Sequence, residues 1–553
     1  MKNTILNLLT CCLISLSGYS QTNSYIKTWD KSIGGSSGEY FSTIQKTPDN
    51  GFIMGGTSVS NTSCDKSQQG RGYLDYWVIK TDSMGNKLWD ATFGGSSDDY
   101  LYSIAQTSNG DFLLGGTSDS PISGDKTENS RGVSDYWVVR IDNSGNKIWD
   151  KRFGGTAWDG LRAVISTSDN CIMLIGYSLS DSSGDKSQDN WSNYSDLWLL
   201  KLDSAGNKIW DKRFGGFAEE LMDQYSNPSD PIDGGYIHQT KDNGFIIACT
   251  STSGIGGDKS QTYVGWDDLW ILKIDSNGVK QWDRTYGGTQ GDEMSSLILL
   301  QNSGFVLAGR TLSGIGGNKT EPLWGTHSDF WIVKLDSMGN KIWDKDIGGT
   351  DYEEEFGNIV ETQDGGLLMI GISYSNISGN KTENNSLGAE QNWVIKLDSN
   401  GLVQWDKTIY TIDHEEAEGK VIEDGNNCFV VVHMTSASIG GYKSQNTCNS
   451  SNDFWMVKFC DSLSLTSTQD ISPISNFQIF PNPTSGLINI ELPEMPEPNS
   501  LLTIINPLGE IVQQQNVINR LTKINMTLPD GIYFIKLNSS NKSVTKKIIV
   551  QNE

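Results

Sequence analysis

The sequence has little of what enzymes commonly use for catalysis. Only four histidines occur among its 553 residues, and none shows metal-ligand spacing. It has no nucleophile motif and no phosphate-binding loop. His414, Glu415 and Glu416 are adjacent, and adjacent side chains rarely converge on one ion. We therefore expect no enzyme, no catalytic residue and no resident cofactor, with Ca²⁺ as the one ion that the acidic residues described below could attract.

Positive charge is also scarce. The 42 Lys and Arg residues face 67 Asp and Glu residues, which gives a formal net charge of −25. Such an acidic surface disfavours nucleic acid and anionic membranes as partners. The one apolar segment of note, Ile5–Leu16, follows Lys2 and precedes small residues, so residues 1–20 are expected to be a signal peptide. No other stretch is long enough to span a membrane.

Proline is rare, with 13 residues, whereas 60 glycines and 18 tryptophans indicate short strands and many turns. Fourteen of the tryptophans occupy two repeated positions, and seven of these fourteen precede an aspartate. The W-D tryptophans are Trp29, Trp89, Trp149, Trp210, Trp282, Trp343 and Trp405. The others are Trp77, Trp137, Trp198, Trp270, Trp331, Trp393 and Trp455.

Each repeat is predicted to contain four strands. In one repeat the strands are like 101–107, 111–117, 135–142 and 147–153, with a long polar loop between the second and the third. The third strand is apolar on both faces, which a propeller blade between two neighbours requires. An open solenoid would also supply neighbours.

The two ends of the repeat region favour a closed ring. The region begins with a fourth-type strand at residues 25–33 and ends with a third-type strand at residues 453–460. Pairing these two strands would complete the last blade and remove an open edge. We therefore predict an all-β protein with a seven-bladed β-propeller over residues 21–460.

The segment G-G-S-S-D-D-Y-L-Y-S-I-A-Q-T-S-N-G-D-F-L-L-G-G-T at residues 94–117 resembles the bacterial β-propeller repeat family. The D-S-x-G-N-K-x-W pattern is similar, more weakly, to the Trp-bearing repeat of quinoprotein propellers. That second resemblance keeps a quinoprotein-like enzyme open as an alternative.

The C-terminal region differs in character. A Ser- and Thr-rich linker at residues 461–476 precedes F-Q-I-F-P-N-P-T-S-G-L-I-N-I and further short strands, which predict a small β-sandwich over residues 477–553. The set resembles the type A sorting domain of type IX secretion in Bacteroidetes. The matched residues are Pro481, Asn482, Pro483, Gly486, Gly509, Gly531, Tyr533, Lys546 and Lys547. The resemblance implies the type IX secretion machinery as a partner and a secreted or outer-surface location.

Two charged positions recur in every repeat. A carboxylate follows each Gly-Gly, or its equivalent in the last repeat: Glu39, Asp99, Asp159, Glu220, Asp292, Glu353 and Glu415. The long loop always holds a lysine: Lys66, Lys126, Lys186, Lys259, Lys319, Lys381 and Lys443. The carboxylates could bind a cation near the channel mouth and the lysines an anion, but a role in maintaining the blade is favoured for both sets.

Departures from the repeat are more informative about ligands. The four non-repeat tryptophans, Trp158, Trp191, Trp266 and Trp324, all fall in loops expected on one face. Exposed aromatic rings are typical of glycan or protein contact, and they could equally pack on neighbouring loops. The expected function is thus surface or secreted binding of a glycan or protein. A glycan-degrading enzyme and a structural surface-layer or adhesion protein remain alternatives.

The cysteines divide into two groups. Cys64 and Cys448 lie in the long loops of the first and the last repeat, which are neighbours in a closed ring, so a disulfide is predicted between them. Cys171, Cys249 and Cys428 lie at or beside the second strand and are expected to be buried and free. Cys460 ends the last third-type strand and receives no role.

Overall fold

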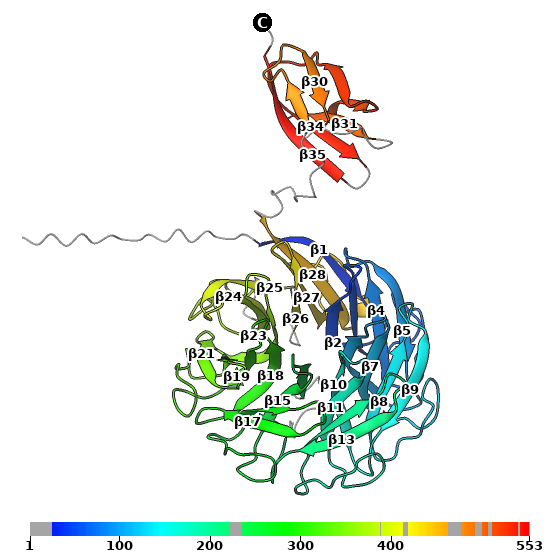
Figure 1. Cartoon of the computed structure of the whole chain (residues 1–553), viewed down its shortest axis with the longest axis vertical. Coiled ribbons are helices and arrows are strands. Elements are labelled where there is room, and N and C mark those ends of the chain that lie inside the picture. The colour runs from blue at the N-terminus through cyan, green and yellow to red at the C-terminus, as the bar shows by residue number, and fades with distance from the viewer. Residues whose placement is uncertain are drawn as a thin grey trace, which may run out of the picture. The chain divides into compact units, whose positions relative to one another are not determined.

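The computed structural model describes residues 25–220, 235–386, 389–412, 419–462, 477–492, 500–506, 511–539 and 542–551. The chain divides into two units, Met1–Leu463 and Ser464–Glu553 (Figure 1). The described part is almost entirely β structure, with one short 3-10 helix at Cys448–Ser450. The predicted all-β class is confirmed. The expected signal peptide lies outside the described residues, as does nearly all of the expected linker.

The described part of the first unit contains seven four-stranded sheets, here named sheets 1 to 7 in chain order. Sheet 1 consists of β2 (Glu39–Lys46), β3 (Phe52–Ser58), β4 (Asp75–Thr81) and β5 (Lys87–Phe93). Sheet 2 consists of β6 (Asp99–Gln106), β7 (Phe112–Ser118), β8 (Asp135–Ile141) and β9 (Lys147–Phe153). Sheet 3 consists of β10 (Asp159–Ser166), β11 (Ile172–Ser178), β12 (Asp196–Leu202) and β13 (Lys208–Phe214). Sheet 4 consists of β14 (Tyr236–Gln239), β15 (Phe245–Ser251), β16 (Asp268–Ile274) and β17 (Lys280–Tyr286). Sheet 5 consists of β18 (Asp292–Leu299), β19 (Phe305–Thr311), β20 (Asp329–Leu335) and β21 (Lys341–Ile347). Sheet 6 consists of β22 (Glu353–Glu361), β23 (Leu367–Ser373), β24 (Gln391–Leu397) and β25 (Val403–Ile409). Sheet 7 consists of β26 (Lys420–Gly425), β27 (Cys428–Thr435), β28 (Asp453–Asp461) and β1 (Tyr25–Ile33).

The third strand of each sheet lies between two hydrophobic cores. In β8, Trp137 and Val139 pack with sheet 1, whereas Tyr136 and Val138 pack with sheet 3. Successive side chains of a strand point to opposite faces, so a strand covered on both sides is apolar throughout. This explains the absence of polar alternation in the third strands.

Cores of this kind join each sheet to the next in chain order. A further core joins sheet 7 to sheet 1, where Phe454 and Met456 pack with Phe52 and Trp77. Figure 1 shows the sheets around a central axis, with β2, β10 and β26 near the axis and β5, β9 and β13 at the periphery. The repeated four-stranded sheets fit propeller-like blades.

Sheet 7 takes its outer strand from the beginning of the repeat region. β1 pairs antiparallel with β28, from Tyr25 opposite Asp461 to Ile33 opposite Phe454. The other six sheets consist of four strands consecutive in sequence. The meander therefore puts the sheet-to-sheet crossings and the long loops on one face, the loop face, and the short turns on the opposite face, the turn face.

The described part of the second unit contains two sheets. One is β29 (Gln478–Phe480), β30 (Leu487–Glu491) and β33 (Leu521–Asn525), and the other is β32 (Ile511–Asn516), β31 (Leu501–Ile505), β34 (Gly531–Ser539) and β35 (Lys542–Val550). Ile488 and Ile490 of the first sheet share a core with Ile504 and Ile535 of the second. Two sheets with a common core form a small β-sandwich. No helix among the described residues is long and apolar enough to cross a membrane.

Deleting residues 21–34 should destabilise the first unit. The deletion removes β1, which leaves the edge of β28 unpaired and withdraws Ile33 from the core between sheets 7 and 1. Thermal unfolding should show a lower midpoint for the deleted chain than for the chain that begins at residue 21. Equal midpoints would mean that β1 does not stabilise the unit.

Candidate functional site

A buried hydrogen bond recurs at the same place in all seven sheets. The indole N–H of the third-strand tryptophan donates to the aspartate of W-D on the outer strand, over 3.2 Å from Trp137 to Asp150 and 3.1 Å from Trp455 to Asp30. The other pairs are Trp77 with Asp90, Trp198 with Asp211, Trp270 with Asp283, Trp331 with Asp344 and Trp393 with Asp406. Each aspartate also accepts the backbone N–H that follows the loop lysine, such as Thr127 N–H to Asp150 at 2.9 Å. The W-D motif thus fastens the long loop to its sheet.

The Gly-Gly pairs mark the crossings between sheets. A Cβ at Gly154 would lie 1.9 Å from the Asp135 carboxylate of sheet 2, and one at Gly155 would lie 2.5 Å from Ser180 of sheet 3. The crossing backbone passes between these side chains, so neither position has room for a side chain. The corresponding contacts recur at the other five Gly-Gly pairs.

The six described carboxylates that follow the crossings are fully buried. Asp159 accepts the Gly155 N–H at 2.7 Å and the Ser180 hydroxyl at 2.9 Å, and Asp99 and Asp292 accept the corresponding bonds. Burial raises the pKa of Glu39 to about 7 and that of Asp99 to about 6. Among the described residues, no three acidic, His or Cys side chains are placed to hold a metal ion. Glu415 lies outside the described residues.

The seven loop lysines are also buried. Lys66 Nζ donates to the Thr92 hydroxyl at 2.7 Å, and its ammonium lies 5.5 Å from the centroid of the Trp77 ring. Lys443 makes the same two contacts, with Ser32 of β1 and with Trp455. Burial lowers the pKa of Lys66 to about 8. Buried and hydrogen-bonded in this way, these ammonium groups hold the loops down and do not form an exposed anion-binding ring.

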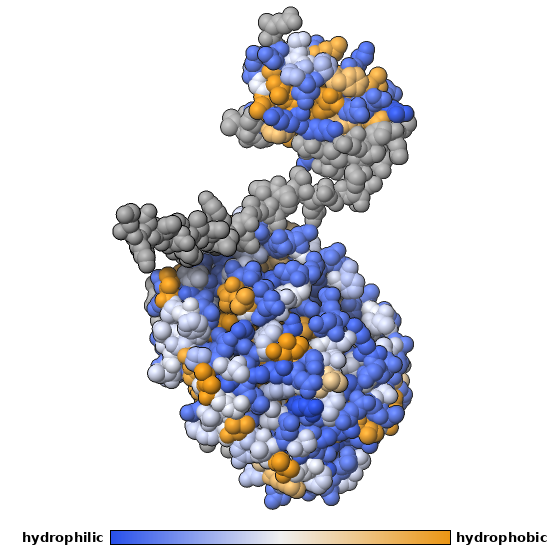
Figure 2. All heavy atoms as spheres, turned by 60° about the vertical axis from the view of Figure 1, so that its left-hand side comes forward, coloured by the Kyte–Doolittle hydropathy of each residue, from blue (hydrophilic) through white to orange (hydrophobic). Residues whose placement is uncertain are grey.

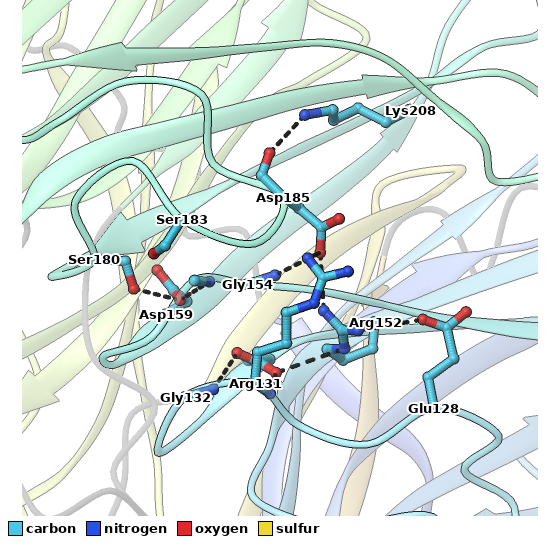
Figure 3. A network of polar contacts seen from close by, with 12 residues as sticks. Glu128, Arg131, Gly132, Arg152, Gly154, Asp159, Ser180, Ser183, Asp185 and Lys208 are labelled. Atoms are coloured by element: carbon cyan, nitrogen blue, oxygen red, sulfur yellow. Dashed lines mark hydrogen bonds and ion pairs between the residues drawn. The ribbon is translucent and has the colours of Figure 1, made fainter.

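Neighbouring sheets meet on the loop face through a recurring polar junction, drawn for sheets 2 and 3 in Figure 3. Asp185 of sheet 3 accepts the Gly154 N–H at 3.2 Å and pairs with Arg131 at 2.8 Å and Arg152 at 2.9 Å (Figure 3). Arg131 lies directly over Gly184, where a Cβ would come within 2.9 Å of its side chain. The junction therefore consists of one long-loop residue of a sheet packed on a left-handed glycine in the loop of the next sheet.

The same packing recurs around the unit. The pairs are Arg71 on Gly124, Arg131 on Gly184, Trp191 on Gly257, Val264 on Gly317 and Trp324 on Gly379. Cys448 occupies the corresponding place in sheet 7, because its N–H donates to Asp453 as the Arg131 N–H donates to Asp135. Cys64 occupies the glycine place in sheet 1, with a φ of 48°.

The structure pairs Cys64 with Cys448, with their Cα atoms 6.4 Å apart. At the boundary between sheet 7 and sheet 1, this disulfide replaces the packing contact that forms the junction between other neighbouring sheets. A second disulfide joins Cys428 of β27 to Cys460 of β28. The expectation that Cys428 is free and that Cys460 has no role is therefore wrong, because the two residues are directly opposite in the strand register. Cys249 is buried and free, whereas Cys171 is free but only partly buried.

The four loop tryptophans have two different environments. Trp191 and Trp324 are junction residues, and Trp191 also donates to Asp258 at 2.9 Å and packs edge-on against Phe217. Packing on a neighbouring loop therefore accounts for these two rings. Exposure does not separate the two pairs, because Trp191 and Trp324 are 39% and 48% exposed and Trp158 is 41% exposed. Trp158 and Trp266, the latter 68% exposed, hold no junction place and are the aromatic candidates for ligand contact. The expanded loop at 217–235 lies mostly outside the described residues.

A set of exposed isoleucines lies at the tips of the long loops and was not predicted from the sequence. They are Ile122, Ile255, Ile315, Ile377 and Ile439, and their exposed fractions lie between 55% and 68%. The signal was present in the sequence as Ile-[Ser/Gly]-Gly-x-Lys, which ends in the loop lysine in five of the seven repeats. Sheets 4 to 7 carry four of them in succession, so we name Ile255, Ile315, Ile377 and Ile439 the isoleucine arc.

The matched residues of the second unit are structural where they are described. The Asn482 side chain donates to the Lys547 carbonyl at 3.0 Å and accepts the Ile549 N–H at 2.9 Å, which ties the P-N-P segment to β35. The Tyr533 hydroxyl donates to the Pro529 carbonyl at 3.1 Å, and the Lys546 ammonium lies 5.5 Å from the Phe477 ring centroid. Gly509 lies outside the described residues.

Residues 478–551 match the family described as the secretion system C-terminal sorting domain. This domain marks the chain as secreted or attached to the outer surface, delivered by the type IX secretion machinery. The location and the C-terminal resemblance expected from the sequence are therefore confirmed.

The chain also has more distant similarities. The Regulatory protein FlaEY of Caulobacter vibrioides is 22% identical over 374 residues, which cover 64% of this chain and 38% of FlaEY. The chain thus spans little more than a third of that relative. PorZ, a surface component of the type-IX secretion system of Porphyromonas gingivalis, aligns with a TM-score of 0.38 and 10% identity over 93% of this chain and 59% of its own. A gluconolactonase of Xanthomonas campestris aligns with a TM-score of 0.30 and 10% identity over 63% and 97%.

The variant Cys64→Gly tests the disulfide at the boundary of sheets 7 and 1. It installs the residue that the junction has elsewhere, so the loop keeps its conformation while the cross-link is lost. We expect a loss of about 2–4 kcal/mol in the free energy of unfolding, reduced by the relief of left-handed strain at residue 64. Cys171→Ser, which removes a free cysteine, should leave the stability unchanged. Recovery of both Cys64 and Cys448 as free thiols in non-reducing peptide mapping would contradict the cross-link.

Glu39→Gln should flatten the pH dependence of stability between about pH 4.5 and 7. The pKa of Glu39 is raised from 4.5 to about 7 in the folded chain, so its contribution is fully present below pH 4.5 and is lost as the pH rises through 7. At 1.36 kcal/mol per pKa unit, the loss is on the order of 3 kcal/mol. Chemical unfolding across this range measures it.

Asp49→Asn is the matched control for Glu39→Gln. The pKa of Asp49 is lowered to about 2, mainly through bonds with Thr47 and Lys80 that outweigh the effect of burial. Its contribution is therefore present above the unfolded pKa and is lost as the pH falls toward 2. The control should change the pH dependence below about pH 4 only. Equal slopes for Glu39→Gln and the parent chain between pH 4.5 and 7 would refute the assignment.

Proposed function

We propose that the first unit is a closed seven-bladed β-propeller that acts as a secreted or cell-surface binding module. Closure is supported by the β1–β28 pairing, by the core between sheets 7 and 1, and by the Cys64–Cys448 pair at the same boundary. A ring closed in this way presents one continuous loop face.

The ligand is proposed to be a protein that contacts the isoleucine arc. Single exposed apolar residues are common on protein surfaces, but an exposed isoleucine at the same loop position of four consecutive sheets is a patterned feature. Sheet 3 has Ser182 at this position and sheet 1 has Thr62, so the loop conformation does not require isoleucine. Aliphatic side chains give contact area without directional hydrogen bonds, which suits a protein surface better than a sugar.

The patches on the face drawn in Figure 2 are small and separated by hydrophilic surface. An interface built from separate apolar contacts within a polar surround is typical of complexes that form and dissociate. Trp266, in the long loop of sheet 4, is 68% exposed and would add an aromatic contact.

A catalytic role is not part of the proposal. His238 Nε2 lies 2.8 Å from the Leu297 carbonyl and His433 Nδ1 lies 3.0 Å from the Met434 carbonyl, so both rings are engaged with backbone. Burial lowers the pKa of His433 to about 4 and keeps this ring neutral. The recurring acids and lysines are buried within the sheets, where a substrate would not reach them.

Replacing the isoleucine arc by serine tests the proposal. Serine is the residue of sheet 3 at this position, so the four-fold variant should keep its stability to within about 0.5 kcal/mol per site. The full chain would be incubated with proteins of the cell surface and the medium, and the captured proteins identified by mass spectrometry. A partner retained by the parent chain should be lost by the variant.

The matched control replaces four apolar residues of similar exposure on outer strands, Leu88, Ile148, Ile209 and Ile342, by serine. It should retain the partner. A partner lost by the control as well, or retained by the arc variant, would locate binding elsewhere.

A further inference from the structure

The turn face carries a groove of about 510 Å³ between sheets 6 and 7. The residues that line it include the aromatic residues Tyr25, Trp405 and Phe429 and the amide residues Gln363, Gln404 and Asn427. Asp364, Lys396 and Glu423 also line it. The volume is in the range of small-molecule sites.

The groove follows from the way in which sheet 7 is assembled. Elsewhere the W-D tryptophan of one sheet packs on the glycine of the turn between the third and fourth strands of the next sheet. A Cβ at Gly145 would lie 3.0 Å from Trp89, and one at Gly401 would lie 3.0 Å from Trp343. Sheet 7 has no such turn, because its outer strand β1 comes from the other end of the repeat region. Trp405 therefore lacks the glycine contact that its counterparts have.

Tyr25, at the start of β1, takes the place of the missing turn. Its ring centroid lies 4.2 Å from that of Trp405, and the Trp405 ring stacks on the buried Phe429 at 5.6 Å. Tyr25 and Trp405, the latter packed on Phe429, therefore form an aromatic wall of the groove. The corresponding groove between sheets 2 and 3, of about 370 Å³, has no aromatic residue in its lining, which includes Asn109, Arg140 and Ser204. There the turn is present, and Arg140 donates to the Ser204 carbonyl at 2.6 Å.

The charged groups of the groove are already engaged. Asp364 pairs with Lys396 at 3.0 Å, and Glu423 accepts the Gln363 N–H at 3.0 Å. A charged ligand would have to compete with these pairs. The amides of Gln404 and Asn427 are exposed beside the aromatic wall and offer both donors and acceptors.

We propose that this groove binds a neutral saccharide. One face of a sugar ring is a sheet of C–H groups that packs on an aromatic surface, and its hydroxyls project from the edge toward donors and acceptors. Tyr25 and Trp405 supply the surface, and Gln363, Gln404 and Asn427 supply the edge contacts. The site lies on the turn face and is independent of the isoleucine arc.

Isothermal titration of the full chain with cellotetraose, maltotetraose and mannotetraose tests the site. At least one tetrasaccharide should bind, and Trp405→Ala should weaken that binding by about tenfold or more. Gln404→Ala changes an exposed residue of an outer strand, so it tests the site even if Trp405→Ala fails to fold; it should weaken binding by about threefold or more. Asn109→Ala in the groove between sheets 2 and 3, and the isoleucine-arc variant, should bind as the parent chain does.

Three results would overturn the proposal. One is the absence of heat for all three sugars at millimolar concentration. Another is saccharide binding that Gln404→Ala and Trp405→Ala leave unchanged. The third is binding of tetramethylammonium chloride, lost in Trp405→Ala, without binding of any tetrasaccharide, which would make the groove a cation site.

Discussion

The architecture of the first unit depends on one buried hydrogen bond, from the third-strand indole to the carboxylate of W-D. The carboxylate is buried, so leaving it unpaired would cost far more than a solvent-exposed bond contributes. The indole and the backbone of the long loop both donate to one oxygen of this carboxylate, as Trp137 and Thr127 do to Oδ2 of Asp150. A single aspartate thus fixes the third strand, the outer strand and the loop of its sheet together. In sheet 7 the aspartate is Asp30, and its tryptophan is 425 residues away.

The crossings depend on these loops in turn. In six of the seven sheets, the aspartate that opens the third strand accepts backbone N–H groups of the long loop and lies against the first glycine of the crossing. Sheet 6 differs from the other sheets at both of these positions. It has Gln391 in place of the aspartate, and the crossing that follows has Tyr410 and Thr411 in place of the two glycines. Gln391 still accepts the Ser386 N–H of its long loop at 2.9 Å, so the bond to the loop is kept although the crossing lacks its glycines.

Much of this was accessible from the sequence, because a repeat exposes its own constraints. Tryptophan spacing gave the number and order of strands, and the unmatched strands at the two ends predicted that β1 would pair with β28. The Cys428–Cys460 pair escaped prediction because it depends on the register of two strands, which sequence spacing alone does not set. The burial of the loop lysines was not predicted because lysine is normally a surface residue. Only the contacts with Thr92 and Trp77 in the structure explain why Lys66 is buried. Trp191 and Trp324 were ambiguous because their partners lie in the loop of the next sheet. The isoleucine arc could have been predicted from its sequence pattern but was not.

Because sheet 7 combines strands from both ends of the repeat region, it is the last sheet of the unit that can form during synthesis. β1 leaves the ribosome first among the strands, and its partner β28 leaves after every other strand of the unit. Throughout synthesis β1 has no sheet to join, although local contacts form within each completed meander. A chain that stops before residue 453 has all the sequence of six sheets and still lacks the strand on which β1 must pair. Pairing of β1 with β28 therefore requires that the repeat region has been translated to its last strand, so an incomplete product carries an exposed edge by which it differs from the finished protein.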